Sequence, residues 1–344
     1  MRKIEPKHSF YELFAYEQIQ DLINNIEIHR EVPLKYSYFG EGASLWDAYA
    51  RRLMNEDELN AINSTPKLIK ANIDYIDDML SRFEKVNIVD ITIGNAAPAK
   101  YLIDHILKSG KLDKYIAIDA SKDILRLAEA NLAKWFGGKV QFEGYEMDIN
   151  NTRFSHLIRK EQNNPKETNL ALYLGGTSHN FRSLEASFEV IHDSLSIDDY
   201  LIHTLKLDSP VSRKYFDFNP NPPTTEKVLS PRHELTLSLM DLRSAQLMSL
   251  SQADYDVEMD YDEKLRQRYV RIRLKEDVVL AFNIGGRSKS VELKKGETLL
   301  LLRMWHQTPE DVYNVLEKTE FDTLHTSQTS SQEYLMTISR IKRS

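Results

Sequence analysis

The chain of 344 residues contains no cysteine, and this absence excludes several kinds of protein. Without thiols there is no disulfide framework, no thiolate metal site and no cysteine nucleophile. Histidine does not replace cysteine as a metal ligand, because the ten histidines are scattered and none is four residues from another. We therefore expect no metal site.

Positive charge is also scarce. Lysine and arginine number 45 against 52 acidic residues, which gives a net charge of −7, and no long basic stripe suits a nucleic acid. No window holds 18 uncharged apolar residues, and the start, residues 1–6, lacks the apolar region of a signal peptide. Neither a Gly-x-Ser-x-Gly elbow nor a Walker loop occurs. We expect a soluble cytoplasmic protein with no nucleic-acid or membrane partner.

What the chain does contain is a series of apolar segments that each end in glycine or in polar residues. Ile88–Ile93 precedes Gly94, Tyr115–Ile118 precedes Asp119, and Leu170–Leu174 precedes two glycines and Asn180. Another apolar segment, at 140–142, leads to Asp148 and Ile149. This order at regular intervals is typical of a doubly wound α/β sheet, in which ligands bind at the carboxyl ends of the strands.

The residues at these strand ends predict an adenosine-containing cofactor. Gly94 allows close approach of a nucleotide-sized ligand, and Asp119 accepts hydrogen bonds from both ribose hydroxyls. Asp148 receives the exocyclic amine of adenine while Ile149 covers a face of the ring. Asn180 offers both a donor and an acceptor to a ligand.

Each of these residues also has a purely structural interpretation. An Asp or Asn that follows a strand often caps the next helix, and this alternative stays open for Asp119 and Asn180. Gly94 is not a complete glycine fingerprint, because Thr92 and Ala96 stand where further glycines are usual.

The remaining patterns predict two lobes. The βα alternation continues to about residue 203, and a final hairpin of Phe321–Ser327 and Glu333–Ile341 returns to the same sheet. We expect a cofactor-binding core of residues 62–203 and 303–344 and a substrate-binding lobe of residues 1–61 and 204–302. Two long helices and a run of strands are expected outside the βα series: helices Phe10–Ile28 and Lys67–Phe83, consecutive antiparallel strands Tyr269–Leu274, Val278–Ile284 and Ser288–Leu293, and a strand Leu299–Trp305.

A βα core with an antiparallel hairpin at its end resembles class I S-adenosylmethionine-dependent methyltransferases. Four segments resemble one branch, the histidine Nα-methyltransferases of ergothioneine biosynthesis. Leu174–Phe181 reads Leu-Gly-Gly-Thr-Ser-His-Asn-Phe and is similar to that family's Leu-Gly-Ser-Thr-Ile-Gly-Asn-Phe. Tyr38–Asp47, Tyr115–Ser121 and Leu205–Asp217 are similar to three further family segments.

The resemblance implies a class I methyltransferase sheet with a second α+β lobe, S-adenosylmethionine as cofactor and S-adenosylhomocysteine as product. The implied cofactor-binding residues are Gly94, Asn95, Asp119, Ala120, Ser121, Asp148, Ile149 and Gly175. The implied contacts to a small-molecule acceptor are Tyr38, Asn180, Tyr215, Leu302 and Met304. Tyr38 is also the candidate catalytic group, because its hydroxyl can accept a proton from the acceptor amine.

One departure from the family changes the expected acceptor. Leu302 and Met304 stand where the family has a Glu and a Ser that hydrogen-bond an imidazole. An imidazole facing two apolar side chains loses about 1–3 kcal/mol per unpaired group. Alternation along the strand would point Leu300, Leu302 and Met304 the same way, toward the acceptor or simply into a core. We therefore expect methylation of an amine on an amino acid, or a derivative of one, other than histidine.

Two other functions stay open. The Thr92 substitution is compatible with a non-catalytic, methyltransferase-like binding protein. A nicotinamide-dependent oxidoreductase uses similar strand ends, but it would carry the three-glycine fingerprint that is missing here.

Overall fold

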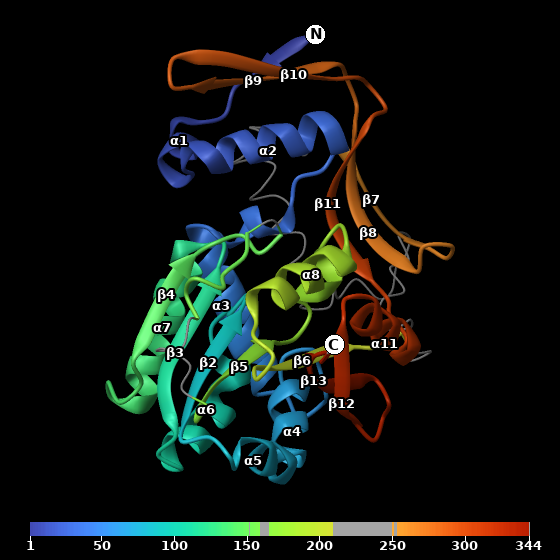
Figure 1. Ribbon diagram of the computed structural model, residues 1–344. Helices are drawn as coiled ribbons and strands as arrows, with labels where there is room; N and C mark the ends of the chain where they lie inside the picture. Colours follow the sequence, from blue (N-terminus) through green and yellow to red (C-terminus); the bar gives the residue numbers. More distant parts are fainter. Residues whose placement is uncertain (151, 159–164, 209–249, 251–252, 344) are drawn as a thin grey trace. The chain divides into compact units, whose positions relative to one another are not determined.

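The computed structural model describes residues 1–150, 152–158, 165–208, 250 and 253–343 (Figure 1). These residues form two compact units. The first unit comprises the described residues of Met1–Trp46 and Asp217–Trp305, and the second those of Asp47–Phe216 and His306–Ser344. Which unit binds the cofactor and which the acceptor stays a prediction.

A seven-stranded sheet forms the centre of the second unit. Its strands are β2 (Lys85–Ile91), β3 (Leu112–Asp119), β4 (Phe142–Glu146), β5 (Glu167–Tyr173), β6 (Tyr200–Lys206), β12 (Phe321–Gln328) and β13 (Tyr334–Ile341). Their order is β12-β13-β6-β5-β2-β3-β4. The five strands β2 to β6 are parallel, whereas β13 is antiparallel to both β6 and β12. The expected doubly wound sheet with a C-terminal antiparallel hairpin is confirmed.

Helices cover this sheet because its central strands are apolar on both faces. Every residue of β5 is buried, and so are Val86–Ile91 of β2. The α-helices that lie wholly within the described residues of this unit are α4 (Ser64–Ala71), α5 (Ile73–Leu80), α6 (Lys100–Lys108), α7 (Lys122–Phe136), α8 (Leu184–Ser194) and α11 (Pro309–Lys318). Val89 and Ile91 share a buried apolar cluster with Phe188 of α8 and Val312 of α11. Helices α8 and α11 contact each other in front of the sheet in Figure 1, and α4 packs against α6.

The predicted single helix Lys67–Phe83 is wrong, because α4 ends at Ala71 and α5 begins at Ile73. Asn72 lies between them with φ −119° and ψ 19°, outside the helical region. Its side-chain Nδ2 donates to the Leu68 carbonyl at 2.8 Å, so it competes with the backbone for the end of α4.

Among its described residues, the first unit contains two three-stranded sheets and three helical segments. The sheets have the orders β1-β9-β10 and β11-β8-β7. Their strands are β1 (Arg2–Ile4), β7 (Tyr255–Asp262), β8 (Gln267–Leu274), β9 (Val278–Ile284), β10 (Arg287–Leu293) and β11 (Thr298–Trp305). The helical segments are α1 (His8–Leu13), α2 (Tyr16–His29) and the 3-10 helix η1 (Leu34–Tyr38), and α3 (Glu41–Met54) runs across the boundary between the units.

Two predictions for this unit need correction. The expected helix Phe10–Ile28 is interrupted, because Phe14 and Ala15 are extended. Phe14 packs into the core of the unit, and Gln18 accepts a hydrogen bond from the Ala15 N–H at 2.9 Å, which starts α2 afresh. The β9-β10 hairpin is confirmed, but β8 and β9 do not pair, since β1 occupies the other edge of β9 and β7 and β11 occupy the edges of β8.

In the described part of the chain, no helix is both long and apolar enough to span a bilayer.

Candidate functional site

The loop after β2 contains three closely spaced departures from ordinary backbone geometry. Thr92, Gly94 and Ala96 have φ values of +59°, +57° and +61°. This left-handed conformation suits Gly94 but is unfavourable for the two residues that carry a Cβ, and most of all for the β-branched Thr92. Thr92 and Ala96 therefore hold a backbone conformation that glycine, but not they, would adopt without strain.

Asn95 holds this loop against its surroundings. Its Nδ2 donates to Asp47 Oδ1 at 3.0 Å, and its Oδ1 accepts from the Ala97 N–H at 3.1 Å. Asn131 of α7 donates to the Asn95 carbonyl at 3.0 Å. Both polar ends of the Asn95 side chain are thus engaged within the unit, and its predicted contact with the cofactor stays a prediction.

Asp119, the last residue of β3, lies beside this loop. Its carboxylate accepts the Ser121 N–H at 3.0 Å. Burial raises the pKa of Asp119 to about 7, the backbone N–H groups of Ser121, Gly94 and Ala120 act to lower it, and the charge of Asp148 raises it further. Three of the predicted cofactor-binding residues, Gly94, Asp119 and Asp148, therefore lie close enough to influence one carboxyl group.

The neighbouring predicted residues have structural contacts of their own. Ser121 caps α7, because its hydroxyl accepts the Ile124 N–H at 3.3 Å. Asp148 accepts from the backbone and side chain of Asn150, at 3.0 Å and 2.6 Å. Ile149 is buried in the apolar cluster between the sheet and α8.

A second buried carboxyl group, that of Asp90, was not among the predicted site residues. Asp90 is 2% exposed and accepts a hydrogen bond from the hydroxyl of Tyr115, which is fully buried. Burial raises the pKa of Asp90 to about 8; the Tyr115 hydrogen bond lowers it and the charge of Asp119 raises it. The sequence does mark this residue, because Asp90 is an acid within the mostly apolar strand β2. Its hydrogen-bond partner could not be predicted, since Tyr115 lies on another strand, β3.

The loop after β5 carries Gly175 and Asn180. Gly175 has a φ of +78°, and its N–H donates to Thr204 Oγ1 of β6 at 3.0 Å. Asn180 closes the 3-10 helix η3 (Thr177–Asn180), and its Nδ2 donates to the Gly176 carbonyl at 3.2 Å. Because a carbonyl can only accept, this contact fixes which end of the amide is which.

The side-chain oxygen of Asn180, unlike its nitrogen, is left without a hydrogen bond to any described residue. Oδ1 of Asn180 is buried, and no described residue gives it a hydrogen-bond donor. The alternative that Asn180 caps α8 is wrong, since Ser183 caps that helix by accepting the Ala186 N–H at 3.2 Å. A buried amide oxygen without a donor is costly, so Asn180 stays a candidate for contact with a ligand.

Two buried histidines lie at the same loop, His179 within it and His203 on the strand β6. His203 of β6 is 1% exposed and lies 3.2 Å from the Ser178 hydroxyl through Nε2. Burial and the neighbouring His179 lower the pKa of His203 to about 3, so its ring is neutral at physiological pH. Neither histidine was predicted from the sequence as part of the site.

The predicted acceptor residues of the first unit have mixed surroundings. Tyr36 and Phe39 belong to its core, whereas Tyr38 between them is half-buried and its ring meets that of Trp46 edge-on at 5.7 Å. Tyr215 lies outside the described residues.

The prediction that Leu300, Leu302 and Met304 point the same way is wrong. A bulge in β11 shifts the register between Leu300, which pairs with Arg271, and Leu302, which pairs with Val270. Met304 pairs with Arg268, two residues before Val270, so Leu302 and Met304 share one face and Leu300 lies on the other. Both Leu302 and Met304 are half-buried, and Leu302 packs against the core of its unit.

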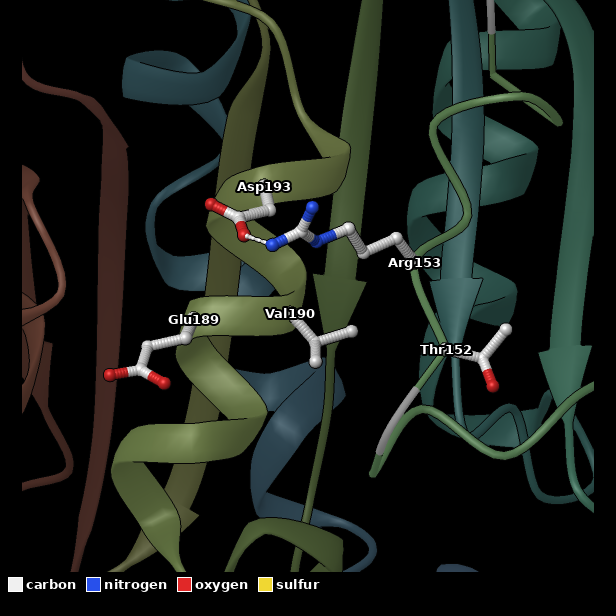
Figure 2. Close-up of a pocket in the computed structure, with 5 residues that line it drawn as sticks. All are labelled: Thr152, Arg153, Glu189, Val190 and Asp193. Carbon is white, nitrogen blue, oxygen red and sulfur yellow. Dashed lines mark ion pairs between the residues drawn. The ribbon is translucent and has the colours of Figure 1, made fainter.

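A surface cavity elsewhere in the second unit is lined by none of the predicted residues. Figure 2 shows Arg153, from the segment after β4, paired with Asp193 of α8 across this cavity. Glu189, Val190 and Thr152 complete the lining. Its lining carries one cationic side chain, Arg153, and two anionic ones, Glu189 and Asp193. Among the residues that the structure describes, no group of three or more His, Asp or Glu could hold a metal ion.

Comparison with known proteins identifies one family. Residues 17–341 match the histidine-specific, S-adenosylmethionine-dependent methyltransferases. No curated protein matches the chain. Among solved structures, a protein from Pyrococcus horikoshii OT3 is 12% identical with a TM-score of 0.46, covering 88% of this chain and 100% of its own. An S-adenosylmethionine-dependent methyltransferase from Clostridium acetobutylicum ATCC 824 is 11% identical with a TM-score of 0.44, covering 87% and 99%.

Proposed function

Because the chain belongs to the histidine-specific, S-adenosylmethionine-dependent methyltransferase family, we propose that it methylates the amine of a small molecule, an amino acid or amino-acid derivative other than histidine. The family requires S-adenosylmethionine as the cofactor and removes the oxidoreductase alternative. The acceptor and the reacting atom are our inference from the side chains around the strand ends.

The cofactor-binding part of the proposal is supported by the grouping of Gly94, Asp119 and Asp148. When bound, S-adenosylmethionine supplies a sulfonium-activated methyl group that needs positioning more than activation. Asp119 would hold the ribose hydroxyls and Asp148 the adenine amine, with Gly94 leaving room for the backbone to approach the ligand. The pKa of about 7 for Asp119 leaves a substantial fraction of this carboxyl ionised, and thus able to accept two hydrogen bonds, at neutral pH.

The observation that supports an acceptor with a hydrogen-bond donor, for which we propose an amine, is the Oδ1 of Asn180, unpartnered among the described residues. This oxygen can only accept, so the group that satisfies it must donate an N–H or O–H. An amine donates through one N–H while its lone pair points elsewhere, toward a methyl group. If the methylated group were a carboxylate, its negatively charged oxygens would face the partially negative amide oxygen of Asn180, and the two would repel each other. Asn180 follows β5, which neighbours β2 in the sheet, so it lies one strand away from Gly94.

The reaction that these groups would serve is a direct displacement. The neutral amine nitrogen forms a bond to the methyl carbon as the carbon–sulfur bond breaks, and sulfur keeps the electron pair. The nitrogen then carries one proton too many, which passes to water or to a hydroxyl group of the protein. Tyr38, half-buried beside Trp46, is the predicted hydroxyl.

The choice against histidine rests on Leu302 and Met304. The bulge in β11 keeps these two residues on one face, and neither side chain offers a strong hydrogen-bond partner to an imidazole. An acceptor with an apolar or aromatic side chain loses no hydrogen bond when that side chain packs against Leu302 and Met304. This supports an acceptor with a less polar side chain than that of histidine.

The test compares Asn180→Ala with Ser183→Ala, three residues further along the same loop. We expect Asn180→Ala to reduce methyl transfer from labelled S-adenosylmethionine by about tenfold or more, because the hydrogen bond that orients the amine is lost, while S-adenosylhomocysteine affinity stays within about twofold. Ser183→Ala removes only a helix cap, so it should lower the melting temperature and leave specific activity unchanged. Equal activity losses in the two folded variants would contradict the proposal.

A further inference from the structure

Four polar side chains of the second unit join the loop after β2 to two helices. Asn95 of the loop donates from Nδ2 to Asp47 Oδ1 of α3 at 3.0 Å, and Asn131 of α7 donates from Nδ2 to the Asn95 carbonyl at 3.0 Å. Arg51, one helical turn after Asp47, completes a closed ring. Its Nε lies 2.8 Å from Asp47 Oδ2, and its Nη2 donates to Asn131 Oδ1 at 3.0 Å. We call these four residues the polar ring.

The polar ring has one preferred arrangement, because each of its amides uses both ends. Asn95 donates to Asp47 and accepts the Ala97 N–H at 3.1 Å, and Asn131 donates to Asn95 and accepts from Arg51. Turning either amide over would lose two hydrogen bonds. Asp47, Asn95 and Asn131 are all buried, and a buried network whose groups are paired in this way is rigid.

The loop needs such a restraint at Ala96. Its φ of +61° is unfavourable for a residue with a Cβ, and strain of this kind persists only where the surroundings hold it. Both peptide groups that flank Ala96 are bonded to the polar ring. Asn131 holds the carbonyl of Asn95 on one side, and the Asn95 side chain holds the N–H of Ala97 on the other.

We propose that Asp47 and Arg51 are positioning residues for the cofactor. Acting through Asn95 and Asn131, they hold the loop that carries Gly94 in the conformation that receives S-adenosylmethionine. This inference rests on the proposed function. A loop that is held in its binding conformation before the ligand arrives loses less conformational entropy on binding. Helix α3, which the sequence assigned to the substrate-binding lobe, would thus also serve the cofactor.

The experiment measures S-adenosylhomocysteine binding by variants of the full chain. Asp47→Ala removes the group that both Asn95 and Arg51 contact, and Arg51→Ala opens the ring but leaves the bond between Asp47 and Asn95. Arg51→Lys keeps the charge but lacks the planar fork that spans two partners. Calorimetry gives the affinity and the fraction of protein that binds, and thermal melting without ligand gives stability.

The matched control is Asp104→Ala on α6, the helix that follows the loop. Asp104 and Lys108 form an ion pair of 2.6 Å with the same four-residue spacing as Asp47 and Arg51, but they take no part in the polar ring. This variant therefore shows what the loss of a helical ion pair does by itself.

We expect Asp47→Ala to weaken S-adenosylhomocysteine binding by about tenfold with the binding fraction unchanged, because a charge-assisted hydrogen bond to the loop is lost. Arg51→Ala should weaken it by about threefold, and Arg51→Lys by less. The double variant should lose clearly less than the product of the two single losses, since both residues act through one ring. Asp104→Ala should bind like the unmutated protein.

Two results would overturn the inference while leaving the proposed function intact. In the first, Asp47→Ala lowers the melting temperature or the binding fraction but not the affinity, so the ring only stabilises the fold. In the second, the losses of the two single variants multiply in the double variant, so Asp47 and Arg51 act independently. If Asp47→Ala does not fold, undiminished affinity in Arg51→Ala is the overturning result. If the unmutated protein does not bind S-adenosylhomocysteine, the proposed function and this inference are both wrong.

Discussion

Replacing Asp90 by asparagine should make the protein less sensitive to rising pH. Asp90 is 2% exposed at the end of β2, and burial raises its pKa from 3.8 to about 8. Between these two values the folded protein holds a proton that the unfolded chain releases. The stability contributed by this proton is complete below about pH 4 and is lost as the pH rises toward 8.

The size of the effect follows from one proton. Each pH unit inside this window lowers the free energy of unfolding by up to about 1.4 kcal/mol, so a rise from about pH 5 to about pH 7 costs about 3 kcal/mol through Asp90 alone. Asparagine cannot ionise, yet its Oδ1 can still accept the hydrogen bond from Tyr115. Asp90→Asn should therefore remove the pH dependence of stability that Asp90 contributes. The contributions of the other ionisable groups, including Asp119, should stay.

Urea unfolding at several pH values measures the difference. Tyr115→Phe is the matched control, because it breaks the same hydrogen bond but keeps the carboxyl group. The Tyr115 hydrogen bond lowers the pKa of Asp90, so its loss should preserve the pH dependence or extend it to higher pH. If Asp90→Asn keeps the full pH dependence of the unmutated protein, the buried carboxyl does not hold the proton assigned to it.

Two further predictions concern the ligands. Asp119→Ala should weaken S-adenosylhomocysteine binding at least tenfold, from a charge-assisted hydrogen bond of about 1.5–3 kcal/mol, and calorimetry showing undiminished affinity in the folded variant would contradict this role. Leu302→Glu combined with Met304→Ser should shift acceptor preference toward histidine in a competition assay. If the double variant instead melts many degrees lower with no change in preference, this face of β11 is core, because burying an unpaired carboxylate destabilises the fold.

The central sheet could be predicted from the sequence because its signals are local. Buried parallel strands appear as apolar runs, and their carboxyl ends were marked by Gly94, Asp119 and Asn180. The final hairpin was equally clear, since two alternating segments flank a polar turn at 329–332. Local composition is sufficient to predict a strand when both of its faces are buried.

The features that were missed depend on contacts between distant segments. Nothing near Asp90 indicates that the Tyr115 hydroxyl will reach it from β3. The parallel pairing of Arg2–Ile4 with β9 joins residues far apart in the sequence. The bulge in β11 changed which leucines share a face, and a simple alternation rule has no means of placing it.

The central claim is methylation of an amine on an acceptor other than histidine. The most direct measurement incubates the protein with labelled S-adenosylmethionine and a panel of free amino acids, histidine included, beside their N-acetyl counterparts, and identifies the products by mass spectrometry. We predict methylation of a free amino acid with an apolar or aromatic side chain, in preference to histidine, and none of its N-acetyl form. Preferred methylation of free histidine, or equal methylation of an N-acetylated acceptor, would contradict the account.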